Sequence, residues 1–129
     1  MSSTASHIRQ GRGSIRPYLH GPVDLPEFLR QVFGAVELER FEFGPRSLHV
    51  ELGIGDATVV VEAGDLPPGV EAWTGSVYAY VPDVDAVYAK AVAMGAKPLA
   101  PIEDKPYRER QGGFIDGGGN TWWIATYKP

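Results

Sequence analysis

Residues 24–35 read DLPEFLRQVFGA, and this stretch decides the fold because a matching stretch recurs later in the chain. Its apolar residues have the spacing of one helix face, at Leu25, Phe28, Leu29, Val32 and Phe33. Asp24 and Glu27 have the three-residue spacing of a capping box at a helix start. Gly34 is the type of residue that commonly ends a helix in a left-handed conformation. We therefore predict a helix over residues 24–33.

A second helix is predicted 61 residues further on. Residues 84–94 read VDAVYAKAVAM, with apolar side chains on one helix face. A Gly-Ala pair follows at 95–96, as it does at 34–35, and the Val-Asp pair at 84–85 matches the one at 23–24. The shared helix phase, stop signal and flanking pair indicate an internal repeat.

Strand signals surround both helices in the same order. Alternating and β-branched residues predict one strand before each helix and three strands after it. The first set lies at 15–20, 36–43, 47–52 and 58–62, and the second at 76–81, 97–100, 113–115 and 121–127. We therefore predict an α+β fold of two tandem βαβββ modules, about 14–63 and 74–129, whose curled mixed sheets form a cup.

Length and composition limit the classes of function. The 129 residues suit one domain, which we place at 14–129, and we expect residues 1–13 to form a disordered tail without a secretory signal. The absence of cysteine excludes a disulfide framework and a thiolate zinc site. A net charge of −4 gives no general attraction to nucleic acid or to an anionic membrane. No apolar run approaches the ~20 residues of a membrane span, so we expect a cytoplasmic protein.

Several motifs resemble the vicinal oxygen chelate superfamily, the group of glyoxalases, bleomycin-resistance proteins and extradiol dioxygenases. The resemblance covers residues 15–127. It rests on PYL at 17–19, FGA at 33–35, VPDVDA at 81–86, PYR at 106–108 and NTWWIA at 120–125. It implies paired βαβββ modules around a cup and a homodimer, and in the enzymes of the group a divalent metal held by His and Glu side chains. One departure is the Gly-Gly-Gly of 117–119, where that turn usually has Pro-Phe-Gly.

The metal ligands implied by the resemblance are mostly missing from this chain. The corresponding positions are Arg16 or Pro17, Glu62, Ser76 and Trp123. Only Glu62 is a good ligand for a divalent cation, and one carboxylate rarely holds a metal without help. We therefore predict that the chain lacks the usual metal site and has no cofactor.

Two alternatives keep an enzymatic function open. His49 and Glu51 share one side of a strand, and with Glu62 on the next strand they would supply a ligand set for Fe, Mn or Zn. Such a site would suit a metal-dependent lyase, isomerase or dioxygenase. Without a metal, His20 or Glu62 would serve as a general base on a carbonyl compound.

The preferred prediction is a homodimeric protein that binds a small organic ligand in an aromatic-lined cup. In the strand at 76–81, the small apolar residues suit a helix-covered face, which leaves the tyrosines on the opposite face. Arg108 belongs to a mixed-charge run over 103–110 that we expect to be an exposed loop, from which it would reach a ligand carboxylate or phosphate. No catalytic residue is assigned. The predicted ligand-binding residues are Tyr18, His20, His49, Glu62, Ser76, Tyr78, Tyr80, Arg108 and Trp123.

Overall fold

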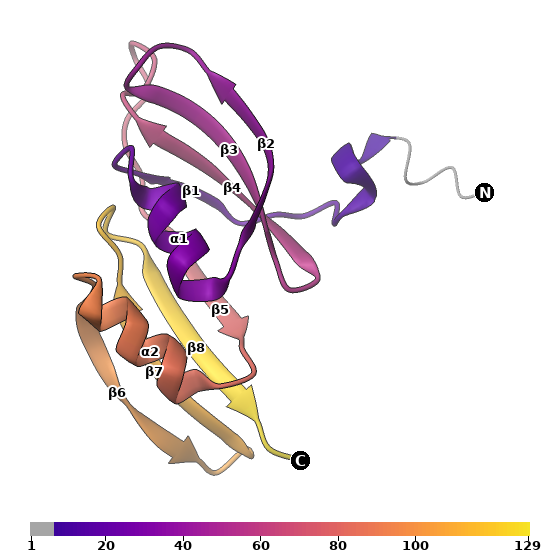
Figure 1. The fold of residues 1–129 in the computed structure, drawn as a ribbon, viewed down its shortest axis with the longest axis vertical. Coiled ribbons are helices and arrows are strands. Elements are labelled where there is room, and N and C mark those ends of the chain that lie inside the picture. Colours follow the sequence, from indigo (N-terminus) through magenta and orange to yellow (C-terminus); the bar gives the residue numbers. More distant parts are fainter. Residues whose placement is uncertain (1–6) are drawn as a thin grey trace.

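The first half of the chain folds as β-α-β-β-β, as the repeat predicts (Figure 1). The computed structural model describes residues 7–129. The elements of this module are β1 (Tyr18–Gly21), α1 (Leu25–Phe33), β2 (Val36–Glu42), β3 (Ser47–Ile54) and β4 (Ala57–Gly64). Its sheet, sheet A, has the strand order β1-β4-β3-β2, with β1 parallel to β4 and the other pairs antiparallel.

The second half repeats this arrangement. Its elements are β5 (Ser76–Tyr80), α2 (Val84–Ala93), β6 (Lys97–Lys105), β7 (Glu109–Ile115) and β8 (Thr121–Tyr127). Sheet B has the order β5-β8-β7-β6, again with one parallel pair, β5 and β8. The predicted α+β fold of two βαβββ modules with mixed sheets is confirmed. Within residues 7–129, no helix has the length and apolar character needed to cross a membrane.

Helix α1 ends as predicted, but its first turn is not capped as predicted. Gly34 closes α1 with a left-handed φ of 66°, a conformation that glycine adopts without steric cost. The predicted capping box is wrong, because the Asp24 side chain caps no backbone amide. Glu27 instead accepts hydrogen bonds from Arg30 and from Gln31, one helical turn further along α1.

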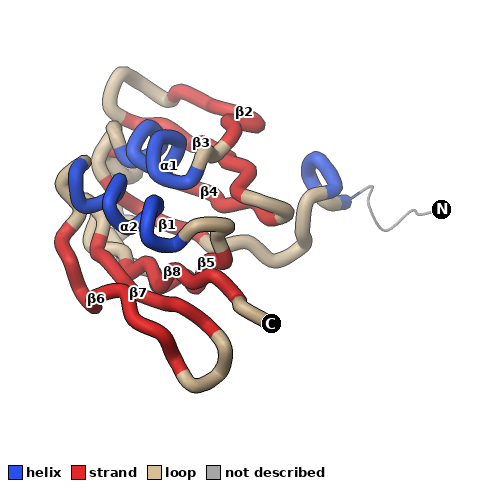
Figure 2. Tube along the Cα trace, turned by 60° about the horizontal axis from the view of Figure 1, so that its bottom comes forward, coloured by secondary structure: helices blue, strands red, loops and turns tan. Residues whose placement is uncertain are grey.

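The two modules share one hydrophobic core. Helices α1 and α2 lie side by side (Figure 2), and the ring of Phe33 on α1 lies 4.8 Å from the ring of Trp122 in sheet B. Phe33 and Phe28 also contact Phe114 of sheet B. Because both helices pack on the core side, each sheet keeps one face that no helix covers.

Asn120 joins the two modules by hydrogen bonds inside this core. Its side chain is fully buried; Nδ2 donates to the carbonyl oxygen of His20 at 3.0 Å, and Oδ1 accepts from the amide of Gly75 at 2.8 Å. The Asp116 carboxylate accepts from Asn120 Nδ2 and from the indole N–H of Trp122. Every polar atom of this buried side chain therefore has a partner, as burial requires.

The mixed-charge run at 103–110 is not the exposed loop that its composition predicts. Strand β6 continues to Lys105 and β7 begins at Glu109, so only residues 106–108 form a turn. The two strands are paired through Lys105 and Glu109 at their ends. Charged residues occupy both faces of this hairpin. The sequence therefore lacks the alternation of polar and apolar residues that would predict a strand here.

The N-terminal segment touches sheet A. Residues 9–11 form a short 3₁₀ turn, and Arg12 donates to the carbonyl oxygens of Gly55 and Ala57. The hydroxyl of Thr58 donates to the carbonyl oxygen of Arg12 at 3.0 Å. Arg9 and Arg12, inside the predicted tail over residues 1–13, thus make defined contacts with the first module, and residues 1–6 lie outside the described residues.

Replacing Asn120 tests its role as the buried link between the modules. Asn120→Ala should lower the free energy of unfolding by about 2–4 kcal/mol, because it leaves buried partners from both modules unpaired. Denaturant unfolding followed by circular dichroism measures this. Gln111→Ala, on an uncovered sheet face, is the control and should cost about 1 kcal/mol or less. An equal loss in both variants would contradict the assignment.

Candidate functional site

The uncovered face of sheet A carries a row of polar and aromatic side chains across its four strands. The strand register places Phe41, His49, Glu62 and His20 side by side, on β2, β3, β4 and β1. Residues paired across strands point to the same face, so sequence alternation correctly brings His20, His49 and Glu62 together. We call this row, with Glu51 and Tyr18, the charged face.

His49 lies between two carboxylates on the charged face. Its Nδ1 contacts Glu62 and its Nε2 contacts Glu51 at 3.1 Å. Carboxylates accept hydrogen bonds, and only the protonated imidazole has two donors. Partial burial lowers the pKa of His49, but the hydrogen bonds and charges of Glu51 and Glu62 outweigh it, so the pKa lies above its ordinary value. The two carboxylates therefore favour the imidazolium form of His49, at the centre of a network that includes both of them.

Glu51 is held by further cations that the sequence analysis did not place in the site. Its side chain is 4% exposed, and one oxygen accepts from Arg16 at 2.9 Å. Arg9 also approaches Glu51, at 3.7 Å, and bonds to Glu39 on β2. No local sequence pattern predicts these pairs, because Arg9 and Arg16 lie in or beside a segment with the composition of a tail.

The alternative metal site is not formed by this arrangement. Glu62 and Glu51 sit on opposite nitrogens of His49, so the three side chains do not converge on one point. Among residues 7–129, no group of three or more His, Asp or Glu side chains has an arrangement that could hold a metal ion. The donor atoms of this set bind one another and do not fit a shared divalent cation.

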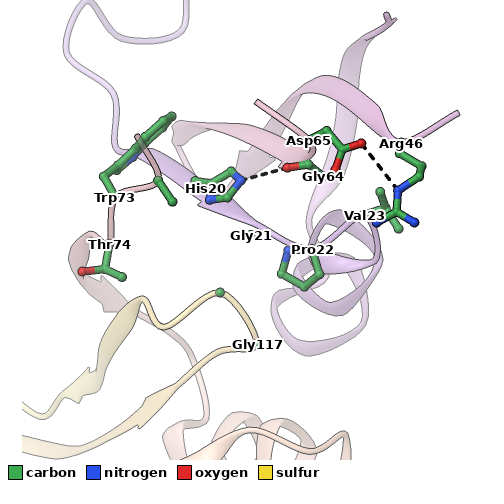
Figure 3. A pocket seen from close by; sticks show the side chains of 12 residues that line it. His20, Gly21, Pro22, Val23, Arg46, Gly64, Asp65, Trp73, Thr74 and Gly117 are labelled. Atoms are coloured by element: carbon green, nitrogen blue, oxygen red, sulfur yellow. Dashed lines mark hydrogen bonds and ion pairs between the residues drawn. The ribbon is translucent and has the colours of Figure 1, made fainter. Parts of the chain in front are cut away.

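A hollow of about 720 Å³ opens beside His20, at the β1 edge of the charged face (Figure 3). His20 Nε2 bonds to the carbonyl oxygen of Gly64 at 2.9 Å, and the Trp73 ring lies 5.5 Å from the imidazole. Arg46 and Asp65, which also line the hollow, form an exposed ion pair at 3.6 Å next to Gly64. A carbonyl only accepts, so Nε2 carries a proton, and in the neutral form of the ring Nδ1 has the lone pair.

The uncovered face of sheet B carries mainly aromatic side chains, whereas the uncovered face of sheet A carries charged ones. The register aligns Tyr78 on β5, Trp123 on β8 and Gly113 on β7. A Cβ at Gly113 would lie 2.8 Å from Trp123 Cε3, so the indole lies against bare backbone that only glycine provides. We call Tyr78, Tyr80, Trp123, Glu109 and Tyr127 the aromatic face.

Glu109 organises the tyrosines of the aromatic face. Tyr78 donates a hydrogen bond to one carboxylate oxygen, and Tyr80 donates to the other at 2.5 Å. Gln111 Nε2 donates to the Tyr78 hydroxyl at 3.1 Å. Sequence reasoning missed Glu109 by treating it as part of a loop. The alternation of Glu109, Gln111 and Gly113 along one strand is the signal that would have found it.

The predicted site residues thus fall into two groups on two sheets. Within residues 7–129, no hydrogen bond or aromatic contact joins the two groups. Arg108 stands apart from both, exposed in the turn between β6 and β7. The first group is Tyr18, His20, His49 and Glu62 on sheet A, and the second is Ser76, Tyr78, Tyr80 and Trp123 on sheet B.

Comparison with known proteins finds likeness among solved structures. TioX from Micromonospora sp. ML1 is 28% identical, with 89% of this chain and 99% of that chain covered and a TM-score of 0.71. A glyoxalase/bleomycin resistance protein/dioxygenase family enzyme from Burkholderia phytofirmans PsJN is 18% identical, covering 87% and 94%, with a TM-score of 0.62. The fosfomycin resistance protein FosX from Listeria monocytogenes, complexed with Mn(II) and sulfate, is 15% identical, covering 90% of each chain, with a TM-score of 0.66. No family model and no curated protein matches the chain.

The ion-pair network makes a prediction about the titration of His49. Glu62→Gln should lower the pKa of His49, because a neutral amide stabilises the imidazolium less than a carboxylate does. Nuclear magnetic resonance titration of the imidazole measures this. The raised pKa also means that the contact stabilises the fold fully below the ordinary histidine value of 6.5, and that this stability is lost as pH rises through the raised pKa.

Glu37→Gln is the control for this titration. It removes an exposed carboxylate that pairs with Arg40 elsewhere on sheet A, and it should leave the pKa of His49 unchanged. If His49 has the same pKa in Glu62→Gln as in the control, the carboxylate of Glu62 does not stabilise the imidazolium.

Proposed function

Because this chain has the fold of the glyoxalase/bleomycin-resistance/dioxygenase superfamily, we propose that it binds a planar organic ligand without the metal of that group. The likeness to the vicinal oxygen chelate superfamily that the sequence motifs indicate is confirmed by the solved structures. The observation that carries the proposal is the aromatic face. Trp123 lies against Gly113 and beside Tyr78, so a flat aromatic surface is held in place before any ligand arrives.

A binding role suits this surface for energetic reasons. Aromatic side chains bury large areas and stack on planar groups, and a surface already held in position lowers the entropy that binding costs. Glu109 fixes Tyr78 and Tyr80 through their hydroxyl groups. The ligand would thus meet rigid rings with few freely rotating side chains.

The proposal that the metal is absent rests on the side chains at the corresponding positions. Trp123 and Ser76 stand on sheet B where the resemblance implies ligands, and indole does not coordinate metals. On sheet A, Arg16 binds Glu51 and His49 binds Glu62, so organic cations neutralise the carboxylates. FosX is described with Mn(II), but at 15% identity that likeness extends to the fold alone.

A second candidate function is favoured by the hydrogen bond of His20. Nε2 donates to Gly64, which leaves the lone pair of Nδ1 as a base beside the hollow that Trp73 lines. A metal-free enzyme acting on a carbonyl compound would use this group to remove a proton. This hollow and the aromatic face lie on different sheets, so binding experiments can separate the two functions.

Substitution of Trp123 tests the proposed binding surface. Trp123→Ala should weaken the binding of N-phenyl-1-naphthylamine, a neutral planar fluorescent probe, by about 1–3 kcal/mol, the scale of a lost buried aromatic contact. This corresponds to about 5- to 150-fold in the dissociation constant, measured by fluorescence titration. Trp73→Ala is the control and should leave the affinity unchanged. If Trp73→Ala weakens binding and Trp123→Ala does not, the probe binds in the hollow beside His20 and not on the aromatic face.

We propose that the protein is a homodimer. Each sheet has only four strands and leaves edge strands exposed, which favours pairing or burial against a partner. Large apolar side chains are also exposed around the two uncovered faces, and contiguous apolar surface is typical of interfaces. They include Phe41, Phe43, Tyr80, Leu99 and Tyr127.

Light scattering tests the dimer. A sample at micromolar concentration should have a molar mass of about twice the 14.0 kDa of one chain. A mass near 14.0 kDa over the whole range of concentrations would contradict the proposal.

A further inference from the structure

We propose that Glu109 and the tyrosines around it bind an organic cation, a quaternary or protonated amine carried on an apolar body. This inference rests on the proposed function, because it names the class of ligand that the aromatic face takes. Its starting point is a carboxylate that, among residues 7–129, accepts side-chain hydrogen bonds from uncharged groups only.

Glu109 is almost completely buried and accepts hydrogen bonds at both of its carboxylate oxygens. It is 9% exposed, and each of its oxygens accepts a hydrogen bond from a phenol, Tyr78 on one and Tyr80 on the other. Phenols are neutral donors, so they solvate the carboxylate without cancelling its charge. Desolvation and the hydrogen bond to Glu109 raise the pKa of Tyr78 to about 12, so this phenol stays protonated at neutral pH.

Two cations beside Glu109 in the sheet bind other carboxylates. Lys105 faces Glu109 across the β6–β7 pair, but its ammonium binds Glu103 at 2.6 Å. Arg110, the next residue along β7, binds Asp85 at 2.8 Å. Within residues 7–129, no Lys, Arg or His forms an ion pair with Glu109. A buried charge without a counter-ion is costly, and a cationic ligand would relieve that cost.

The rings around Glu109 supply the second part of the site. The rings of Tyr78 and Tyr80 lie 5.5 Å apart with planes tilted by 59°. Tyr80, Tyr127 and Glu109 line a hollow of about 420 Å³ that is open to solvent. Aromatic faces attract cations, and clusters of such rings recognise quaternary ammonium groups. Trp123, paired with Tyr78 across the strands, extends this surface for the apolar part of the ligand.

Arg108 is a cation near Glu109 and would favour an anionic ligand over a cationic one. It precedes Glu109 in the turn and is exposed, so a ligand anion could bind it from solvent. An exposed cation contributes little because water screens it, whereas Glu109 is buried among the rings that would touch the ligand. The observations therefore favour a cation, and an anion is an outcome of the test.

Three probes of one shape separate these cases. Phenyltrimethylammonium is cationic, tert-butylbenzene is its neutral isostere, and benzenesulfonate is anionic. Each competes with N-phenyl-1-naphthylamine for the full-length protein, and displacement gives three dissociation constants. We expect phenyltrimethylammonium to bind roughly tenfold or more tightly than tert-butylbenzene, and benzenesulfonate to bind most weakly.

Two variants with the same change in charge locate the effect. Glu109→Gln should reduce the preference for phenyltrimethylammonium over tert-butylbenzene to about twofold or less. Glu37→Gln removes a carboxylate from strand β2 of sheet A and should keep the preference, because its carboxylate pairs with Arg40 and not with the tyrosines. Circular dichroism checks that both variants fold, and the comparison of probes on the unchanged protein needs no variant.

The outcomes distinguish this inference from the proposed function. Equal displacement by the cation and its neutral isostere would overturn the cation site and leave the aromatic binding surface standing. Tighter binding of benzenesulfonate would assign ligand recognition to Arg108 and also overturn it. If N-phenyl-1-naphthylamine itself does not bind, the proposed function fails first. Loss of the preference in Glu37→Gln would show a general charge effect and would count against the site.

Discussion

The packing of Phe33 against Trp122 sets the arrangement of both sheets. Phe33 belongs to α1, which covers sheet A, yet its ring lies 4.8 Å from the ring of Trp122 on the core side of sheet B. The helix-covered faces of the two modules therefore point into one core, and Asn120 completes it with hydrogen bonds to both. The uncovered faces are left available for chemistry because apolar burial has already used the other side of each sheet.

The repeat places different chemistry at equivalent positions. Glu62 and Trp123 occupy matching places on β4 and β8, and their strand partners are His49 and Gly113. In sheet A both partners are ionisable and bind each other. In sheet B the missing side chain of Gly113 makes room for the indole to lie flat. One backbone pattern thus carries an ion-pair network in one module and an aromatic surface in the other, since side-chain type and not fold decides what a site can do.

Two buried carboxylates show how environment separates these faces. Glu51 is surrounded by cations, with Arg16 at 2.9 Å and His49 at 3.1 Å, and its charge is balanced within the protein. Glu109 is similarly buried, but in the described part of the chain its side-chain hydrogen bonds come from phenols alone. Burying a charge is tolerated when it is paired and hydrogen-bonded. Glu51 is both paired with cations and hydrogen-bonded, which suits a structural role. Glu109 is hydrogen-bonded but has no ion-pair partner among residues 7–129.

The fold follows from the amino-acid sequence, because helix periodicity, Gly34 and the 61-residue repeat are local signals that recur in register. The side of the strand that Tyr78 or His49 occupies also follows from the sequence, since alternation along a strand has a period of two. The contacts that these side chains make depend on tertiary packing. Arg16 and Glu51 are 35 residues apart, and Tyr78 and Glu109 are 31 apart. Strand pairing and the course of the N-terminal segment set these contacts, and no short-range pattern encodes such distant partners.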